Sequence, residues 1–421
     1  MIKVTNNISS AKGKIDMMRL FLILCIVVCT SGGSSTAQVA APSRIAANAQ
    51  HTYEFGACEQ QLMWHDGGKL PAQLEHLDAM KKAGCGWVRL SLIYPTKLDE
   101  NLFAILHRCN KLDIKVLMVI EQGRPQLYPA GTKRRPGSEP PGQPAWPCYR
   151  LSELDLKKAE AHLRRFFAEL RARKIRIHAF ELFNEINWFA FNGDLPLVEG
   201  GLMIDEKTDW DHPVFVQYRE GLDRVGRLTK TLHDLNKWIF KGEPEIISAG
   251  LVAYDTMNIG WMKKVKGCIV DQKLTLQLLH GSHPKQKSAT NWLKYVDGIG
   301  MHIYPATVDF NPKTALAEIA ADLDPCRTVP GIGSAKPFWI TECGYSISKF
   351  GNDERRRYNQ HTVFYNALDA YDRDGSIKAV MHFGWSKETT SSYAVWDHGK
   401  FYKTADIFKV PSAEQGAAQN P

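Results

Sequence analysis

Short apolar runs alternate with longer segments of helical periodicity along most of the chain. Eight of these runs have the length and composition of buried strands, and strands alternating with helices are typical of parallel β/α units. Because eight strands close a barrel, the pattern predicts an α/β fold, a single-domain (β/α)8 TIM barrel. The predicted strands are residues 53–57, 86–92, 115–120, 176–183, 245–251, 297–304, 337–342 and 378–385.

The segments between these runs carry helix signals. Pro71 stands where a first helical turn tolerates proline, and Gly84 follows the last turn, so residues 72–83 are predicted to be helical. Ser152 and Asp155 form an approximate capping box before a second helix. Its apolar positions share one stripe, which consists of Leu156, Ala159, Leu163, Phe166, Phe167 and Leu170.

Long connections are predicted after strands three, four and five. Residues 122–150 and 187–213 are rich in glycine, proline and polar residues. In a barrel these loops lie at the carboxyl ends of the strands, where active sites are built, and loops of this length are otherwise hard to justify. No internal repeat interrupts the pattern. One barrel domain is therefore predicted over residues 51–410, with a disordered tail over residues 411–421.

The N-terminus has the features of an export signal. Lys12, Lys14 and Arg19 precede the apolar run "LFLILCIVVC", and small residues follow it. We predict a signal peptide over residues 1–37, with cleavage after Ala37 or Ala41, and a linker over residues 38–50. The run is too short to span a bilayer comfortably, so no stable membrane insertion is expected after cleavage. The predicted location is secreted or periplasmic.

Composition and charge narrow the function classes. The chain has 421 residues, of which 44% are hydrophobic, which excludes global disorder. The formal net charge is +8, but the 53 basic and 45 acidic residues are interspersed. A nucleic-acid groove would require basic residues interleaved with aromatic ones on one face, so no nucleic-acid partner is predicted. The basic residues after strand three suggest either an acidic glycan substrate or a solvated loop; they are Arg124, Lys133, Arg134 and Arg135.

Nine cysteines are present, and removal of the signal peptide takes away Cys25 and Cys29. An oxidising compartment permits disulfides, but seven remaining cysteines leave at least one thiol free, and the sequence does not reveal their pairing. No C-x-x-C pair suggests a zinc site.

Two carboxylates stand at the ends of predicted strands. Glu185, in "ELFNEIN", ends strand four, and Glu342, in "WITECGYS", ends strand seven. A charge buried there is either neutralised by a salt bridge or kept for chemistry. Neighbours in a regular strand face opposite ways, so Asn184 and Glu185 share a site only if the strand end bulges or turns. Retaining glycoside hydrolysis needs two carboxyl groups about 5 to 5.5 Å apart.

Together these motifs resemble glycoside hydrolase clan A, in outline its families 5 and 39, which are TIM-barrel enzymes with catalytic glutamates after strands four and seven. The resemblance implies a glycosidase that acts with retention on a β-linked glycoside or polysaccharide. In that pattern Glu342 is the nucleophile, Glu185 is the acid/base, and Asn184 binds the sugar's 2-hydroxyl. No cofactor and no metal are implied.

The resemblance extends to four further positions in order along the chain. Arg89 in "WVRLSL" matches the strand-two arginine beside the nucleophile, and His302 and Tyr304 in "HIY" match the strand-six pair. Trp385 in "HFGWS" matches the strand-eight sugar platform. Independently of the family, a cation and a phenol near Glu342 are expected to lower its pKa, whereas Glu185 needs a less cationic setting.

Some residues depart from the pattern or lie beside it. Strand three ends in "VIEQG", with Glu121 and Gln122 where family 5 enzymes commonly have a histidine, so the substrate of that family is not implied. Glu181, inside strand four, is interpreted as the structural partner of a basic residue. Cys343, next to Glu342, is interpreted as a packing residue.

Two other readings of the sequence stay open. A magnesium-dependent, enolase-like barrel could use Glu121, Glu185 and Asp255 as ligands, but it leaves Glu342 and Trp385 without a task. A non-catalytic carbohydrate-binding barrel would retain the tryptophans and be indifferent to the carboxylates. Loop aromatic residues could line further sugar subsites or pack within the loops; they are Trp146, Trp188 and Trp210.

Overall fold

The computed structural model describes most of the predicted barrel. The predicted signal peptide, the linker and the tail lie outside the described residues. The described ranges are 53–60, 62–63, 68–91, 100–136, 147–253, 266–286, 290–372, 374–387 and 392–409.

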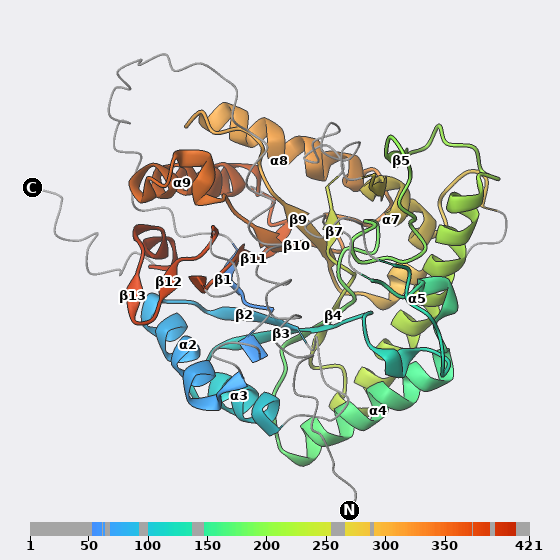
Figure 1. Ribbon diagram of the computed structural model, residues 1–421, viewed down its shortest axis with the longest axis horizontal. Helices are drawn as coiled ribbons and strands as arrows, with labels where there is room; N and C mark the ends of the chain where they lie inside the picture. The colour runs from blue at the N-terminus through green and yellow to red at the C-terminus, as the bar shows by residue number, and fades with distance from the viewer. Residues whose placement is uncertain are drawn as a thin grey trace, which may run out of the picture.

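Parallel strands form one curled sheet in the centre of the molecule (Figure 1). Its order is β6-β4-β3-β2-β1-β11-β10-β9-β7, so each strand lies beside its neighbour in the chain. All eight predicted strands are confirmed, and the fifth is split into β6 and β7. The bounds are β1 Glu54–Cys58, β2 Trp87–Ser91, β3 Lys115–Ile120, β4 Ala179–Leu182, β6 Glu245–Ile247, β7 Leu251–Val252, β9 Ile299–Ile303, β10 Phe338–Cys343 and β11 Ile377–Phe383.

The interrupted fifth strand closes the barrel. Its first half, β6, pairs with β4, and its second half, β7, pairs with β9. An isolated bridge between Ile247 and Gly298 and a hydrogen bond from Ser248 N to Gly298 O (3.1 Å) join the two edges below β7. The predicted (β/α)8 barrel is therefore confirmed.

Helices surround the sheet in chain order, coloured from blue to red in Figure 1. Helix α2 begins with a proline in its first turn and ends at Gly84, whose φ of 101° gives the left-handed cap expected of glycine. Among the described residues, no α-helix follows β11, and a 3-10 turn at Lys403–Phe408 packs beside α9 and α2 instead. The helices are α2 Leu70–Ala83, α3 Glu100–Lys111, α4 Leu156–Ala172, α5 Pro213–Phe240, α7 Gln272–His280, α8 Pro312–Arg327 and α9 Glu354–Tyr371.

The start of α4 differs from the predicted capping box. Asp155 is itself the N-cap, because its side chain accepts a hydrogen bond from Lys158 N. Ser152 lies in a preceding 3-10 turn, and its hydroxyl donates to Asp194 (2.6 Å). The predicted capping box is wrong, because the chain makes this 3-10 turn before the helix begins.

Side chains that point into the barrel form a separate small core below the site. This layer alternates along the strands, as expected of a barrel interior. It consists of Cys58, Trp87, Leu117, Ala179, Ile247, Trp339, Ala379 and Met381, with Phe383 packed on it at the upper end of β11.

The loops contain short strands that the sequence pattern did not predict. Strands β5 Leu202–Ile204 and β8 Cys268–Val270, from the loops after strands four and five, pair in parallel. Strands β12 Trp396–Asp397 and β13 Lys400–Phe401 form a hairpin after β11. These pairs are only two or three residues long, too short for periodicity to detect.

All seven cysteines in the described part of the chain are buried, and none of them forms a disulfide there. Cys343 packs as predicted, with its sulfur 3.8 Å from Tyr365 Oη and 3.5 Å from Met381 O. Among the described helices, none combines the length and apolar character that crossing a bilayer requires.

Candidate active site

The backbone at the end of β4 is turned, not extended. Phe183 and Glu185 have φ values of 72° and 45°, a conformation that non-glycine residues rarely adopt. Gln122 holds the residue between them, since its side-chain oxygen accepts from Asn184 N (3.0 Å) and its amide donates to Asn184 O. Glu185 N donates to Gly250 O (2.9 Å). This turn meets the condition under which Asn184 and Glu185 can share a site.

Glu342, in β10, receives hydrogen bonds on both carboxyl oxygens. Arg89 Nη1 and Gln60 Nε2 each lie 2.6 Å from its Oε1, and Tyr304 Oη donates to its Oε2 at 2.5 Å. Arg89 Nη2 also donates to Asn184 Oδ1 (2.8 Å). The structure therefore brings together three of the predicted residues around Glu342. Gln60, just after β1, is a contact that the sequence analysis missed.

Glu181 pairs with Arg89 through two hydrogen bonds of 2.7 and 3.0 Å, and both side chains are fully buried. This contact confirms its interpretation as the partner of a basic residue. The pair is bidentate, which fixes the plane of the guanidinium.

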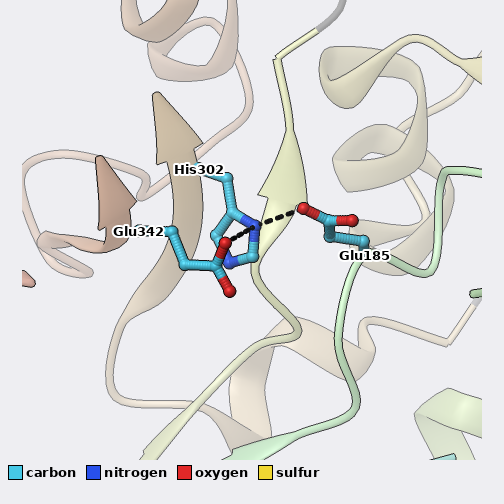
Figure 2. Close-up of side chains that lie close together, drawn as sticks. All are labelled: Glu185, His302 and Glu342. Atoms are coloured by element: carbon cyan, nitrogen blue, oxygen red, sulfur yellow. Dashed lines mark hydrogen bonds and ion pairs between the residues drawn. The ribbon is translucent and has the colours of Figure 1, made fainter. Parts of the chain in front are cut away.

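His302 lies between the two predicted catalytic glutamates, Glu342 from β10 and Glu185 from the turn after β4 (Figure 2). Its Nδ1 is 2.7 Å from Glu185 Oε1 and 3.6 Å from Glu342 Oε2. One oxygen of each carboxyl and one ring nitrogen lie within 4.8 Å of one another. A Cβ at position 250 would stand 2.2 Å from His302 Nε2, so Gly250 is required for the ring to lie here.

Burial governs the protonation of these groups. Burial raises the pKa of Glu185 well above its usual value, and the nearby Glu342 charge raises it further. Burial also raises the pKa of Glu342, although Arg89 and the hydrogen bond from Tyr304 oppose the rise. The predicted lowering of the Glu342 pKa is therefore wrong, because desolvation outweighs the cation. Burial lowers the pKa of His302 well below its usual value, so its ring is neutral.

A stability prediction follows from the raised pKa of Glu185. A carboxyl whose folded pKa exceeds its unfolded pKa stabilises the fold at low pH, and this contribution is lost as pH rises through the folded value. Glu185→Gln removes that loss. We expect the variant to melt a few degrees above the wild type at pH 9 and close to it at pH 5, as measured by thermal unfolding. Equal melting temperatures at both pH values would contradict the raised pKa.

Glu185, His302 and Glu342 also have the spacing of a metal-ligand cluster. A divalent cation there would face the guanidinium of Arg89, which lies 2.6 Å from Glu342. The Arg89 guanidinium and the Tyr304 hydroxyl already engage both Glu342 oxygens. These three side chains therefore do not fit a metal site. In the enolase-like alternative, Asp255 lies outside the described residues.

Trp385 is not in the site, which contradicts its predicted role as a sugar platform. Its side chain is fully buried and packs against Trp396 and Phe408. The cause is Gly384, whose φ of 86° turns the chain after β11 and breaks the alternation of faces.

The aromatic side chain that faces the site from strand eight is Phe383. It continues the inward-facing series of Ala379 and Met381. Its ring is 5.6 Å from that of Tyr304 and 5.3 Å from that of Tyr393, and all three side chains are half-buried. The period-two pattern up to residue 383, followed by glycine, was the signal in the sequence that could have identified it.

The two described loop aromatics make ring contacts with other side chains of the loops. Trp188 packs against Phe189 and Phe191, and Trp210 stacks on His283 at 4.8 Å. Trp146 lies outside the described residues.

The basic residues after strand three are used mainly for loop packing. Arg124 is buried, with Nη1 3.0 Å from His162 Nε2. Arg134 lies over the Tyr149 ring, and Arg135 donates to Phe189 O (2.6 Å). Lys133 is exposed. These contacts favour the loop interpretation over recognition of an acidic glycan.

No family model and no curated protein matches this sequence. The chain is similar in structure to a GH5_18 protein from Streptomyces cattleya in complex with GlcNAc, with a TM-score of 0.51, 12% identity, and coverage of 89% of this chain and 82% of that one. The resemblance to clan A barrels is thus confirmed for the fold.

Two further solved structures are similar at a TM-score of 0.49 each. One is an exo-β-1,4-mannosidase from an Opitutaceae bacterium, at 12% identity, with 85% of this chain and 58% of that chain covered. The other is a β-glycosidase from Pyrococcus horikoshii, at 11% identity, with 86% and 94% covered. The chain thus spans just over half the length of the mannosidase.

Proposed function

We propose that this protein is a glycosidase that cleaves a β-linked glycoside or polysaccharide with retention of configuration, by double displacement. The observation that carries the proposal is the pair of buried carboxyl groups of Glu185 and Glu342, with one oxygen of each within 4.8 Å. So close an approach of two oxygens favours the spacing of about 5 to 5.5 Å between the carboxyl groups of retaining enzymes over the roughly 6.5 to 9.5 Å of inverting ones.

In the first step Glu342 attacks the anomeric carbon while Glu185 protonates the departing oxygen. Both neighbours of His302 Nδ1 are carboxyl oxygens, so the neutral ring fits best with its proton on Nδ1, donating to Glu185 Oε1. This contact leaves Glu185 Oε2, which is buried and has no hydrogen-bond partner among the described residues, to carry the acidic proton. The second step reverses the roles, since Glu185 then deprotonates the water that releases the sugar.

Other residues stabilise the charge that the reaction moves. Arg89 and Tyr304 donate hydrogen bonds to the two oxygens of Glu342. These donors are already in place to stabilise the carboxylate when the bond between the sugar and Glu342 breaks. Asn184 is fixed by Arg89 and Gln122, and its amide nitrogen is available for the sugar's 2-hydroxyl.

Phe383 is the proposed sugar platform. Its half-buried ring ends the inward-facing row of β11 beside Tyr304, whose hydroxyl contacts Glu342. A flat aromatic face suits the C–H side of a pyranose. Phe383→Ala is expected to raise KM about 3- to 10-fold with a smaller effect on kcat. Trp385→Phe is the control, and steady-state kinetics that showed the larger loss at Trp385 would contradict this assignment.

A panel of aryl β-glycosides and of bacterial and plant polysaccharides tests the proposal. We expect turnover by the wild type that a strong chelator leaves unchanged, and proton NMR of the first product should show the β-anomer. Loss of activity with the chelator would favour the magnesium-dependent alternative. Sugar binding without turnover on any substrate would favour a non-catalytic carbohydrate-binding barrel. The proposal includes export to a secreted or periplasmic location, on the basis of the N-terminal sequence pattern.

A further inference from the structure

Glu181 is a third carboxylate in the barrel, and the double displacement gives it no task. It is fully buried in β4, four residues before Glu185. Its Oε1 accepts from Gly250 N (2.8 Å) and lies 3.3 Å from Thr341 Oγ1, in addition to its two contacts with Arg89. These contacts tie strand four to strands two, five and seven at the level just below the two catalytic glutamates.

The contacts of Arg89 show what this carboxylate does. A guanidinium has five N–H bonds in a fixed plane. On one side, Nε and Nη2 donate to Glu181. The remaining donors reach Asn184 Oδ1 (2.8 Å), Glu342 Oε1 (2.6 Å) and Cys58 Sγ (3.4 Å). With all five donors engaged, the bidentate contact with Glu181 determines where the other three point.

Charge gives Glu181 a second effect. Among the described residues, the cluster holds the Arg89 guanidinium, the carboxylates of Glu181 and Glu342, a neutral His302, and the carboxyl of Glu121, whose pKa burial raises. Glu342 therefore shares its cation with another anion. Without Glu181, Arg89 and Glu342 would form a one-to-one buried ion pair, which would stabilise the carboxylate and make it a poorer nucleophile.

We propose that Glu181 is a positioning residue for the glycosidase reaction, which aims Arg89 at Asn184 and Glu342 and shares the cation so that Glu342 stays reactive. The inference rests on the proposed function. It also has an electrostatic consequence. The charge of Glu181 raises the pKa of both Glu342 and Glu185, so its removal should lower both values.

The first test compares two variants of Glu181. Glu181→Gln keeps the size but removes the charge, and we expect both limbs of the pH profile of kcat/KM to move about one pH unit toward acid. Glu181→Asp keeps the charge but is too short to reach Arg89 Nε and Nη2 together while keeping its contact with Gly250. This variant should leave the limbs in place and lower kcat about tenfold, with little change in KM.

A merely structural role predicts a different result. Both variants would then lose activity in proportion to their loss of folded protein, measured by circular dichroism, and neither would move the pH limbs. That outcome would overturn the proposal. If Glu181→Gln does not fold, Glu181→Asp alone tests the positioning role. Full activity of Glu181→Asp would refute that role.

A second readout does not need turnover. Carbon-13 NMR of glutamate-labelled protein follows the carboxyl titrations, and signals are assigned with Glu185→Gln and Glu342→Gln. We expect Glu181→Gln to lower the titration midpoints of Glu185 and Glu342, whether or not a substrate has been found. Unchanged midpoints would refute the charge effect, whereas an inactive wild type with shifted midpoints would refute only the proposed function.

Discussion

Glu342→Gln is expected to reduce turnover of every substrate at least about 10⁴-fold, because an amide cannot form the glycosyl-enzyme bond. Gln can still accept the hydrogen bond from Arg89 through its carbonyl oxygen, and its amide can donate to the Tyr304 hydroxyl, so the site should keep its shape. Sugar binding, measured by calorimetry with a product or an unreactive analogue, should be weakened only slightly. The measurement separates a nucleophile from a residue that only holds the site together.

The matched control for this experiment is Glu160→Gln. Glu160 has a partly exposed side chain on α4 and, among the described residues, pairs with Arg164 on the same helix, so the kinetics of this variant should equal those of the wild type. Turnover by Glu342→Gln above one hundredth of the wild-type rate would remove Glu342 as the nucleophile.

Glu185→Gln is expected to have an effect that depends on the leaving group. Natural sugar leaving groups need protonation, so their release should slow about 10²- to 10⁴-fold. Activated aryl glycosides need no acid in the first step, and they should give a burst of phenol followed by slow release of the sugar. A small nucleophile such as azide should restore turnover and yield the β-glycosyl azide.

The burst and its rescue distinguish the acid/base from the nucleophile, because Glu342→Gln should show neither. Stopped-flow absorbance measures the burst, and mass spectrometry identifies the trapped glycosyl-enzyme. If Glu185→Gln slowed all leaving groups equally, with no rescue by azide, the acid/base role would have to be given to another residue.

The barrel was predictable because its strands are short apolar runs set between amphipathic helices. The interruption of strand five was not, since "EIISAGL" reads as one strand. The break reflects a local requirement, because Gly250 must lack a Cβ where His302 lies, and its amide donates to Glu181. Periodicity carries no information on contacts between residues so far apart in the chain.

Six of the seven predicted site residues meet in the structure, because each stands inside a barrel strand or just past its carboxyl end. The prediction for Trp385 is wrong because the backbone torsion of Gly384 turns the Trp385 ring out of the barrel. Phe383 is left at the inward position. The predicted direction of the Glu342 pKa shift is wrong for another reason. The sequence named the cation and the phenol beside it, but the cost of burying the carboxylate depends on how completely the barrel excludes water, which only the packed structure reveals.

The turned backbone at Phe183 and Glu185 has a consequence for engineering. A left-handed torsion costs a non-glycine residue roughly 1 to 2 kcal/mol, and here the clamp from Gln122 and the hydrogen bond to Gly250 hold two of them in place. Transplanting only the two glutamates into another eight-stranded scaffold would leave the strand straight and send Glu185 and Asn184 to opposite faces. A functional graft must include residues 183–185 together with the Gln122 side chain that hydrogen-bonds their backbone.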